Sequence, residues 1–248
     1  MPSWSLALLS GVLGGATLLI GAALAWFVRV PPKLTAAISA FGAGVLISAL
    51  AYELVQEAAD DGGLLPTVLG TLAGAVVFVG ADALLTRAGA GNRKSAKGSG
   101  SSGGGTAIAA GALIDGIPES IVLGLSVAQG GAGAAISVPI VAAVAISNLP
   151  EGLSSTVGMK ADGRSARYVF TVWGGIAALS AIAALVGFLV FASAPGAVVA
   201  FVTTVAAGAI LAMISNTMIP EAFDRDDVLT GLYAVLGFVT AFALHAVS

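Results

Sequence analysis

The sequence contains no cysteine and only one histidine, His245, among its 248 residues. Without cysteine the chain cannot form disulfides, iron–sulfur clusters, zinc sites built on thiolates or a cysteine nucleophile. A single histidine excludes the His-Glu-x-x-His zinc motif, and the sequence has no Gly-x-Gly-Asp motif. We therefore do not expect an enzyme.

Charged residues are also scarce, at 9% of the chain, whereas hydrophobic residues make up 58% and the mean hydropathy is +1.02. A water-soluble domain carries about 25% charged residues. The net charge of -3 leaves no basic surface for a nucleic acid. These values predict an integral membrane protein that lies in a lipid bilayer.

Eight apolar runs are separated by glycine, proline or clustered charges. About 20 apolar residues are enough to cross the roughly 30 Å hydrocarbon layer of a bilayer. The first run has no basic segment before it, so we expect a retained span rather than a signal peptide. The sequence predicts an all-α polytopic membrane protein, one domain over residues 1–248, with eight transmembrane helices. The runs are 4–28, 34–59, 64–86, 106–129, 134–159, 168–192, 196–222 and 228–247.

Basic residues occur in only half of the connections between these spans. All ten lie in the odd-numbered connections, and lysine and arginine near span ends stay cytoplasmic. We therefore expect both termini outside the cell membrane. Residues 87–105 are rich in glycine, serine and basic residues, which predicts a flexible cytoplasmic loop. The basic residues are Arg29, Lys33, Arg87, Arg93, Lys94, Lys97, Lys160, Arg164, Arg167 and Arg225.

Spans 2 and 7 share a short pattern. Residues 43–47 and 207–211 both read Ala-Gly followed by three aliphatic residues, and both spans end on Glu-Ala, at Glu57 and Glu221. The two spans cross the membrane in opposite directions, so the pattern predicts inverted copies, spans 1–3 and spans 6–8, around spans 4 and 5. Inverted repeats are typical of transporters. Chance similarity is the alternative, because such patterns are common in so apolar a sequence.

Three acidic residues, Asp115, Glu119 and Glu151, lie well inside predicted spans 4 and 5, and Glu53 lies inside span 2. An ionised acid near the centre of a transmembrane helix costs about 2.5 to 3.5 kcal/mol. No lysine or arginine lies in a span interior to neutralise these acids. They must face water, be protonated or share a cation.

The spacing of the acids in spans 4 and 5 favours a shared cation. Asp115 lies four residues before Glu119, and Asn148 lies three residues before Glu151, so each pair projects from one helix face. Each pair also encloses a proline, which frees the carbonyl four residues earlier, at Ile114 and Ile146. The alternative is that the prolines only kink the helices and the acids are protonated in the bundle core.

These motifs resemble those of the ZIP (Zrt/Irt-like) family of divalent metal transporters. Residues 115–120 and 147–152 are similar to the family's His-Asn-x-Pro-Glu-Gly motifs. Residues 53–58 and 219–222 are similar to its Glu-Leu-x-Pro-Glu-Ala and Ile-Pro-Glu-Ala stretches. The resemblance covers nearly the whole chain and implies eight spans with both termini outside. It also implies a mid-membrane metal site formed by Asp115, Glu119, Asn148 and Glu151.

Some positions differ from the family pattern. Asp115 stands where the family usually has a ligand histidine, Gly116 replaces an asparagine, and Ser147 begins the second motif. Span 6 lacks the glutamate that often builds a second metal site. The remaining oxygen ligands suit hard ions such as Mn²⁺ or Mg²⁺, whereas the resemblance implies zinc or iron. The transported ion, with Zn, Mn, Fe and Cd as candidates, therefore stays open.

Other polar residues could line a pathway to this site, although acids near helix ends also reach water on their own. These pathway residues are Glu53, Glu57, Ser147, Asn216 and Glu221. We expect His245 to be a helix-end residue rather than a metal ligand, and Met213 and Met218 to be packing residues.

The sequence predicts a divalent cation transporter that moves metal toward the cytoplasm. The alternative is a related metal-binding or sensor protein that does not transport. A homodimer is a further option that the sequence leaves open.

Overall fold

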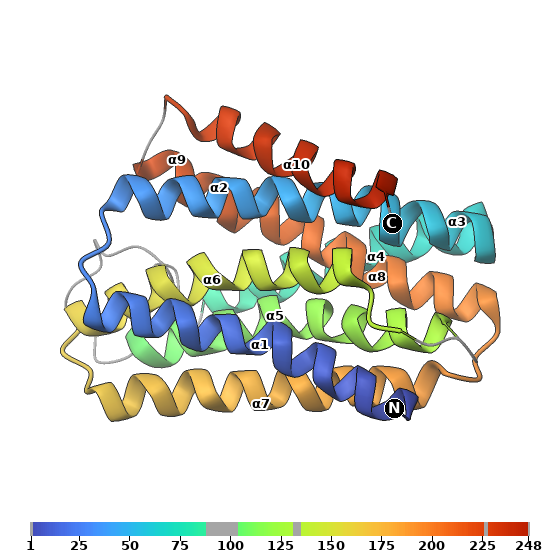
Figure 1. Ribbon diagram of the computed structural model, residues 1–248, viewed down its shortest axis with the longest axis horizontal. Coiled ribbons are helices and arrows are strands. Elements are labelled where there is room, and N and C mark those ends of the chain that lie inside the picture. The colour runs from blue at the N-terminus through green and yellow to red at the C-terminus, as the bar shows by residue number, and fades with distance from the viewer. Residues whose placement is uncertain (1, 88–103, 131–134, 226–227, 248) are drawn as a thin grey trace.

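The computed structural model describes residues 2–87, 104–130, 135–225 and 228–247, and these residues form helices and short connections without a strand (Figure 1). The helices are α1 (Ser3–Phe27), α2 (Pro32–Ala49), η1 (Leu50–Gln56), α3 (Glu57–Gly62), α4 (Leu64–Leu85), α5 (Gly104–Gln129), α6 (Val138–Ala161), α7 (Ala166–Phe191), α8 (Gly196–Met213), η4 (Ile214–Met218), α9 (Ile219–Arg225) and α10 (Thr230–Val247). The segments η1 and η4 are π-helical.

Seven apolar helices among the described residues are long enough to cross a membrane, and α10 contributes a shorter apolar helix. Two of the seven are composite: α2, η1 and α3 run on from Pro32 to Gly62, and α8, η4 and α9 follow one another in the same way. The prediction of an all-helical fold with apolar helices long enough to cross a membrane is confirmed for the described residues. The predicted fifth run begins at residue 134 but its helix begins at Val138, because Ser137 caps it and accepts a hydrogen bond from Ile140 N at 3.4 Å.

Both chain termini lie at one end of the bundle, and the connections α1–α2 and α6–α7, together with α9 and the start of α10, lie at the other end (Figure 1). The described basic residues Arg29 and Arg164 lie in two of these connections. The predicted flexible loop 87–105 lies, for residues 88–103, outside the described residues.

Two helix pairs cross closely at glycines. A side chain at Gly44 of α2 would overlap the backbone carbonyl of Ala234 in α10, and one at Gly208 of α8 would overlap that of Thr71 in α4. Only glycine permits such close backbone approach. The same two crossings hold a second contact each, Gly237 against Phe41 and Gly74 against Val205.

Another set of crossings joins α1, α5, α6 and α7. Gly21 of α1 lies against the Leu149 carbonyl in α6, and Gly124 of α5 lies against the Ala184 carbonyl in α7. Gly15 of α1 packs on the α7 backbone. The tight glycine contacts therefore join α1, α5, α6 and α7 into one group, whereas the other close crossings pair α2 with α10 and α4 with α8.

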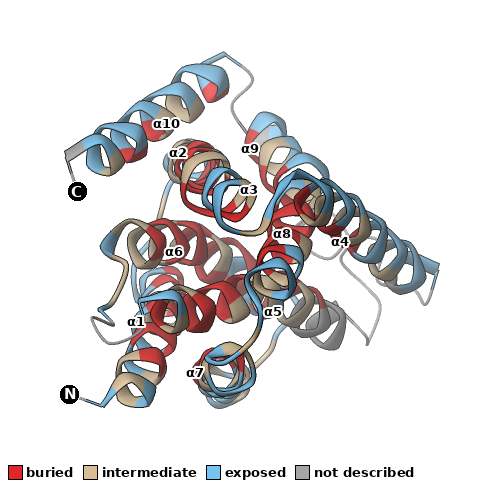
Figure 2. Ribbon diagram, turned by 90° about the vertical axis from the view of Figure 1, so that its right-hand side faces the viewer, coloured by how far each residue is buried: buried red, intermediate tan, exposed pale blue. Residues whose placement is uncertain are grey.

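The outer helices expose apolar faces, whereas the centre of the bundle is buried (Figure 2). On α4, for example, Leu72 and Val76 are 61% and 72% exposed. Large apolar patches are rare on soluble monomers, and here they fit contact with lipid. The buried centre is less uniformly apolar, because it also contains Asp115, Glu119 and Asn148.

Candidate functional site

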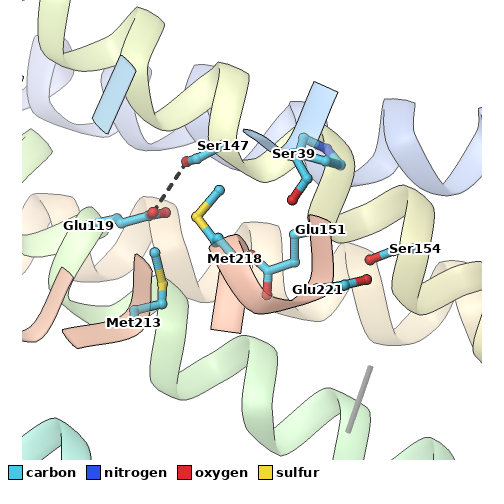
Figure 3. A pocket seen from close by; sticks show the side chains of 9 residues that line it. Ser39, Glu119, Ser147, Glu151, Ser154, Met213, Met218 and Glu221 are labelled. Atoms are coloured by element: carbon cyan, nitrogen blue, oxygen red, sulfur yellow. Dashed lines mark hydrogen bonds between the residues drawn. The ribbon is translucent and has the colours of Figure 1, made fainter. Parts of the chain in front are cut away.

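A small pocket lies among the central helices, and we call it the glutamate pocket (Figure 3). Its volume is about 10 Å³, close to the smallest space that holds one water molecule. No lysine or arginine is among the residues that line it. They are Ser39 of α2, Glu119 of α5, Ser147, Pro150, Glu151 and Ser154 of α6, Met213 of α8, Met218 of η4 and Glu221 of α9.

The sequence of α6 explains why it contributes most of the lining. Its four lining residues, Ser147, Pro150, Glu151 and Ser154, are spaced i, i+3, i+4 and i+7, which places them on one face of an α-helix. Pro150 lies within this helix, which continues through it. The polar face of α6 therefore points into the pocket over two turns.

The π-helical segment η4 brings Met213 and Met218 to the same pocket. Residues five apart in an α-helix differ by about 140° in direction, because each residue turns the helix by about 100°. A π-helix has a wider turn, with hydrogen bonds between residues five apart, and so aligns them better. Both methionines are also buried in the hydrophobic core, which agrees with the predicted packing role. The sequence did not reveal that they would also line the pocket.

Glu119 has a defined partner in the pocket. Its side chain is 2% exposed, and Ser147 Oγ donates a hydrogen bond to Glu119 Oε1 at 3.2 Å. The same hydroxyl lies 2.9 Å from the Val144 carbonyl oxygen of its own helix. A hydroxyl has one proton and can satisfy only one of these two acceptors fully at a time. In Figure 3, the carboxyl groups of Glu151 and Glu221 lie on the other side of Met218 from Glu119.

Asp115 and Asn148 are buried, at 2% and 4% exposure, but do not line the glutamate pocket. Asn148 Nδ2 instead donates a hydrogen bond to the Gly14 carbonyl oxygen of α1 at 3.0 Å, and its Oδ1 accepts none. Glu151 lies three positions after Asn148, so the two side chains leave α6 about 60° apart. This angle is enough to direct one toward α1 and the other toward the pocket.

The four predicted ligands are thus divided between two places. Within the part of the chain that the structure describes, no group of three or more histidine, cysteine or acidic side chains is arranged to hold a metal ion. Ile114 and Ile146, whose carbonyls the prolines free, do not line the glutamate pocket either. The carbonyl of Ile146 lies against Gly42 of α2. The four-residue metal site remains a prediction.

The predicted pathway residues also differ in their surroundings. Ser147 and Glu221 line the pocket, and Glu221 is partly buried, whereas Glu57 and Asn216 are exposed. Glu53 is 9% exposed and lies in η1, between α2 and α3.

Glu53 has a partner that the sequence did not indicate. Its Oε1 lies 2.5 Å from His245 Nδ1 of α10, a pair separated by 192 positions in the chain. The His245 ring also stacks on Tyr52, with ring centroids 5.6 Å apart. His245 is thus a helix-end residue, as expected, but it also pairs with a buried carboxyl group.

Comparison with known proteins does not assign the chain to a family. Neither a protein-family model nor a curated protein sequence matches it.

Proposed function

We propose that this protein is a divalent cation transporter of the ZIP-like type, which moves metal toward the cytoplasm through the glutamate pocket. In this proposal, eight spans lie in the cell membrane with both termini outside. One observation carries it. Glutamates from three separate helices, α5, α6 and α9, line one buried pocket to which no lysine or arginine contributes.

Electrostatics supports a cation as the occupant. Each ionised acid at the centre of a transmembrane helix costs about 2.5 to 3.5 kcal/mol, and three in one pocket would also repel one another. A divalent cation offsets both effects, as would protons. Carboxylate and hydroxyl oxygens suit Mn²⁺ and Mg²⁺, whereas the sulfur atoms of Met213 and Met218 suit softer ions such as Cd²⁺.

Ser147 could take part in binding through its two acceptors. Without a cation, its hydroxyl proton serves Glu119 Oε1 at 3.2 Å. When a cation occupies Glu119, the proton can turn to the Val144 carbonyl oxygen at 2.9 Å, and the hydroxyl oxygen is then free to face the ion. This exchange costs no hydrogen bond, so ion binding and release stay reversible, as transport requires.

We also propose that spans 1–3 and 6–8 are inverted copies. The glycine contacts support this, because Gly44 and Gly208 occupy aligned positions of the repeat and each packs on the third span of the other copy. The contacts of Gly237 with Phe41 and of Gly74 with Val205 pair in the same way. The two π-helical segments, η1 and η4, also begin at aligned positions, Leu50 and Ile214.

The test is metal uptake into liposomes that contain the purified protein. Mn²⁺, Zn²⁺, Fe²⁺ and Cd²⁺ are supplied outside, and each variant is compared with the wild type. We expect Glu119→Gln, Glu151→Gln and Glu221→Gln to abolish uptake of the transported ion. Asp162→Asn is the matched control, because Asp162 is exposed, lies in the α6–α7 connection and does not line the pocket. Unchanged uptake in all three pocket variants would exclude this route.

A metal-binding or sensor protein without transport is the second candidate. Two observations support this candidate: the glutamate pocket is small, and Asp115 and Asn148 are not among its lining residues. Calorimetry on the protein in detergent separates the two. Metal binding that depends on Glu119 and Glu151, together with no uptake of any of the four metals, would favour the sensor.

A further inference from the structure

The contact between His245 and Glu53 joins two helices at the end of the bundle that contains both termini. Glu53 belongs to η1, which continues α2, and His245 lies two residues before the end of the described chain, in α10. The rest of the α2–α10 crossing is held by apolar and glycine contacts. The pair is therefore the polar link at the terminal end of that crossing.

The surroundings of the pair are largely apolar. A cavity of about 20 Å³ beside it is lined by Glu53 and His245 and by side chains such as Val45, Ile146 and Leu244. Tyr52 of η1 stacks on the imidazole ring and also packs against Phe242 of α10, with ring centroids 5.2 Å apart. The His245 side chain is 33% exposed and that of Glu53 9%, so the hydrogen bond lies at the edge of this apolar region.

Further acidic side chains lie close to the pair. Glu57 of α3 interacts electrostatically with Glu53 and His245, and Asp61 interacts with Glu57. The cavity residues from α2 and α6 carry no titratable group: they are Val45, Ser48, Ala49, Pro139, Ala142 and Ile146. The charged side chains that face the pair from η1 and α3 are therefore carboxyl groups.

We propose that Glu53 and His245 form a proton-binding site that fixes the terminal end of α10 to η1. With a proton on both ring nitrogens, the pair is neutral overall and its hydrogen bond is charge-assisted, about twice as strong as a neutral one. Without that proton, a net negative charge remains in an apolar site next to Glu57. Histidine gains and loses its proton near physiological pH, so the docking of α10 depends on pH.

This site is separate from the glutamate pocket, and its test does not require transport. Because the chain has no cysteine, introduced cysteines carry the only spin labels, and because it has one histidine, a histidine signal comes from His245 alone. Spin labels are attached to Leu65→Cys at the start of α4 and Ala246→Cys at the end of α10, two exposed positions. The distance between the labels is measured by pulsed electron resonance on the full chain in lipid nanodiscs, at pH values from 5.5 to about 8.5, a range that spans histidine titration.

We expect the distance distribution to broaden or shift as pH rises, in step with loss of the imidazole proton. Nitrogen-15 labelling of the single histidine measures that proton by magnetic resonance in the same samples. The change should disappear in His245→Gln, which cannot titrate in this range, and in Glu53→Gln, which keeps a hydrogen-bond acceptor but no charge. Glu57→Gln should retain it.

Two results would overturn the proposal. One is a distance distribution in the wild type that is the same at every pH. The other is an identical pH response in wild type, His245→Gln and Glu53→Gln, which would place the titrating group elsewhere. If His245→Gln does not fold, Glu53→Gln alone decides between these outcomes.

Discussion

Glu119 and Glu53 are both buried glutamates in apolar helices, but they have different neighbours. Glu119 shares a pocket with Glu151 and Glu221 and accepts a hydrogen bond from a neutral serine. Glu53 contacts the only histidine of the chain, a group that can carry a positive charge. The lining of the glutamate pocket thus contains three acids and no histidine, lysine or arginine, whereas the acid near the end of the bundle contacts a histidine. A pocket lined by several acids and no basic residue is suited to an exchangeable cation, whereas an acid paired with histidine is suited to holding helices together.

The largest expected difference between the two regions is in metal binding. Glu151→Gln should weaken binding of the preferred metal by at least tenfold, since loss of outer partners alone costs about 10- to 100-fold. Glu53→Gln should change it by less than about twofold, within the scatter of independent sites. Isothermal titration of both variants in detergent measures this. Equal losses in the two variants would mean that the regions do not differ in function.

The second difference is in coupling between side chains. Glu53→Gln and His245→Gln should be non-additive, with an interaction energy of about 0.5 to 3 kcal/mol in the free energy of unfolding, as for residues in contact. Glu119→Gln combined with His245→Gln should be additive to within about 0.5 kcal/mol, because these residues share no partner. Unfolding by sodium dodecyl sulfate gives the four free energies of each cycle. Additivity of the first pair would contradict the contact.

The hydrogen bond to Glu119 offers a third, smaller test of the comparison. Ser147→Ala removes the donor and one potential oxygen ligand, and should weaken metal binding about fivefold, or about 1 kcal/mol. Ser126→Ala is the matched control in α5, because the Ser126 hydroxyl donates to the Leu123 carbonyl oxygen of its own helix at 3.0 Å. Equal effects of the two substitutions on metal affinity would mean that Ser147 takes no part in metal binding.

The smallest expected effect concerns the sulfur atoms of the glutamate pocket. Met213→Leu and Met218→Leu nearly conserve volume and should cost less than about 1.5 kcal/mol in stability. They should lower the affinity for Cd²⁺ relative to Mn²⁺ by a few fold, because thioether ligands favour softer ions. Competitive titration with both metals measures the ratio. An unchanged ratio of Cd²⁺ to Mn²⁺ affinity would mean that both methionines serve only in packing.

Most of the helices could be predicted from the sequence, because a bilayer requires long apolar runs and every run is visible as composition. The start of α6 could not, because it depends on the Ser137 cap. Glu119 and Glu151 lie in one pocket, as their motifs predicted, but Asn148 turns toward α1. A spacing of three residues leaves about 60° between the side chains of Asn148 and Glu151. Which of the two contacts α1 depends on how α1 packs against α6.

Other parts of the candidate site have no local signal at all. Met213 and Met218 line the same pocket because η4 is π-helical, a geometry that residue spacing does not specify. The contact of His245 with Glu53 joins residues 192 positions apart, so it depends on how α10 packs on α2. Sequence motifs therefore locate the acids but do not identify all of their neighbours.

The wide turns of η1 and η4 also affect how the chain tolerates a change in length. Removing one residue from an ordinary transmembrane helix rotates everything beyond it by about 100° and brings polar side chains to the lipid. A π-helical segment contains surplus backbone, so loss of one residue there can be absorbed by a return to α-helical winding. Removing one residue from η1 or η4 would therefore leave the helix segments on either side facing the lipid as before. Only the side chains of the widened turn itself would change direction.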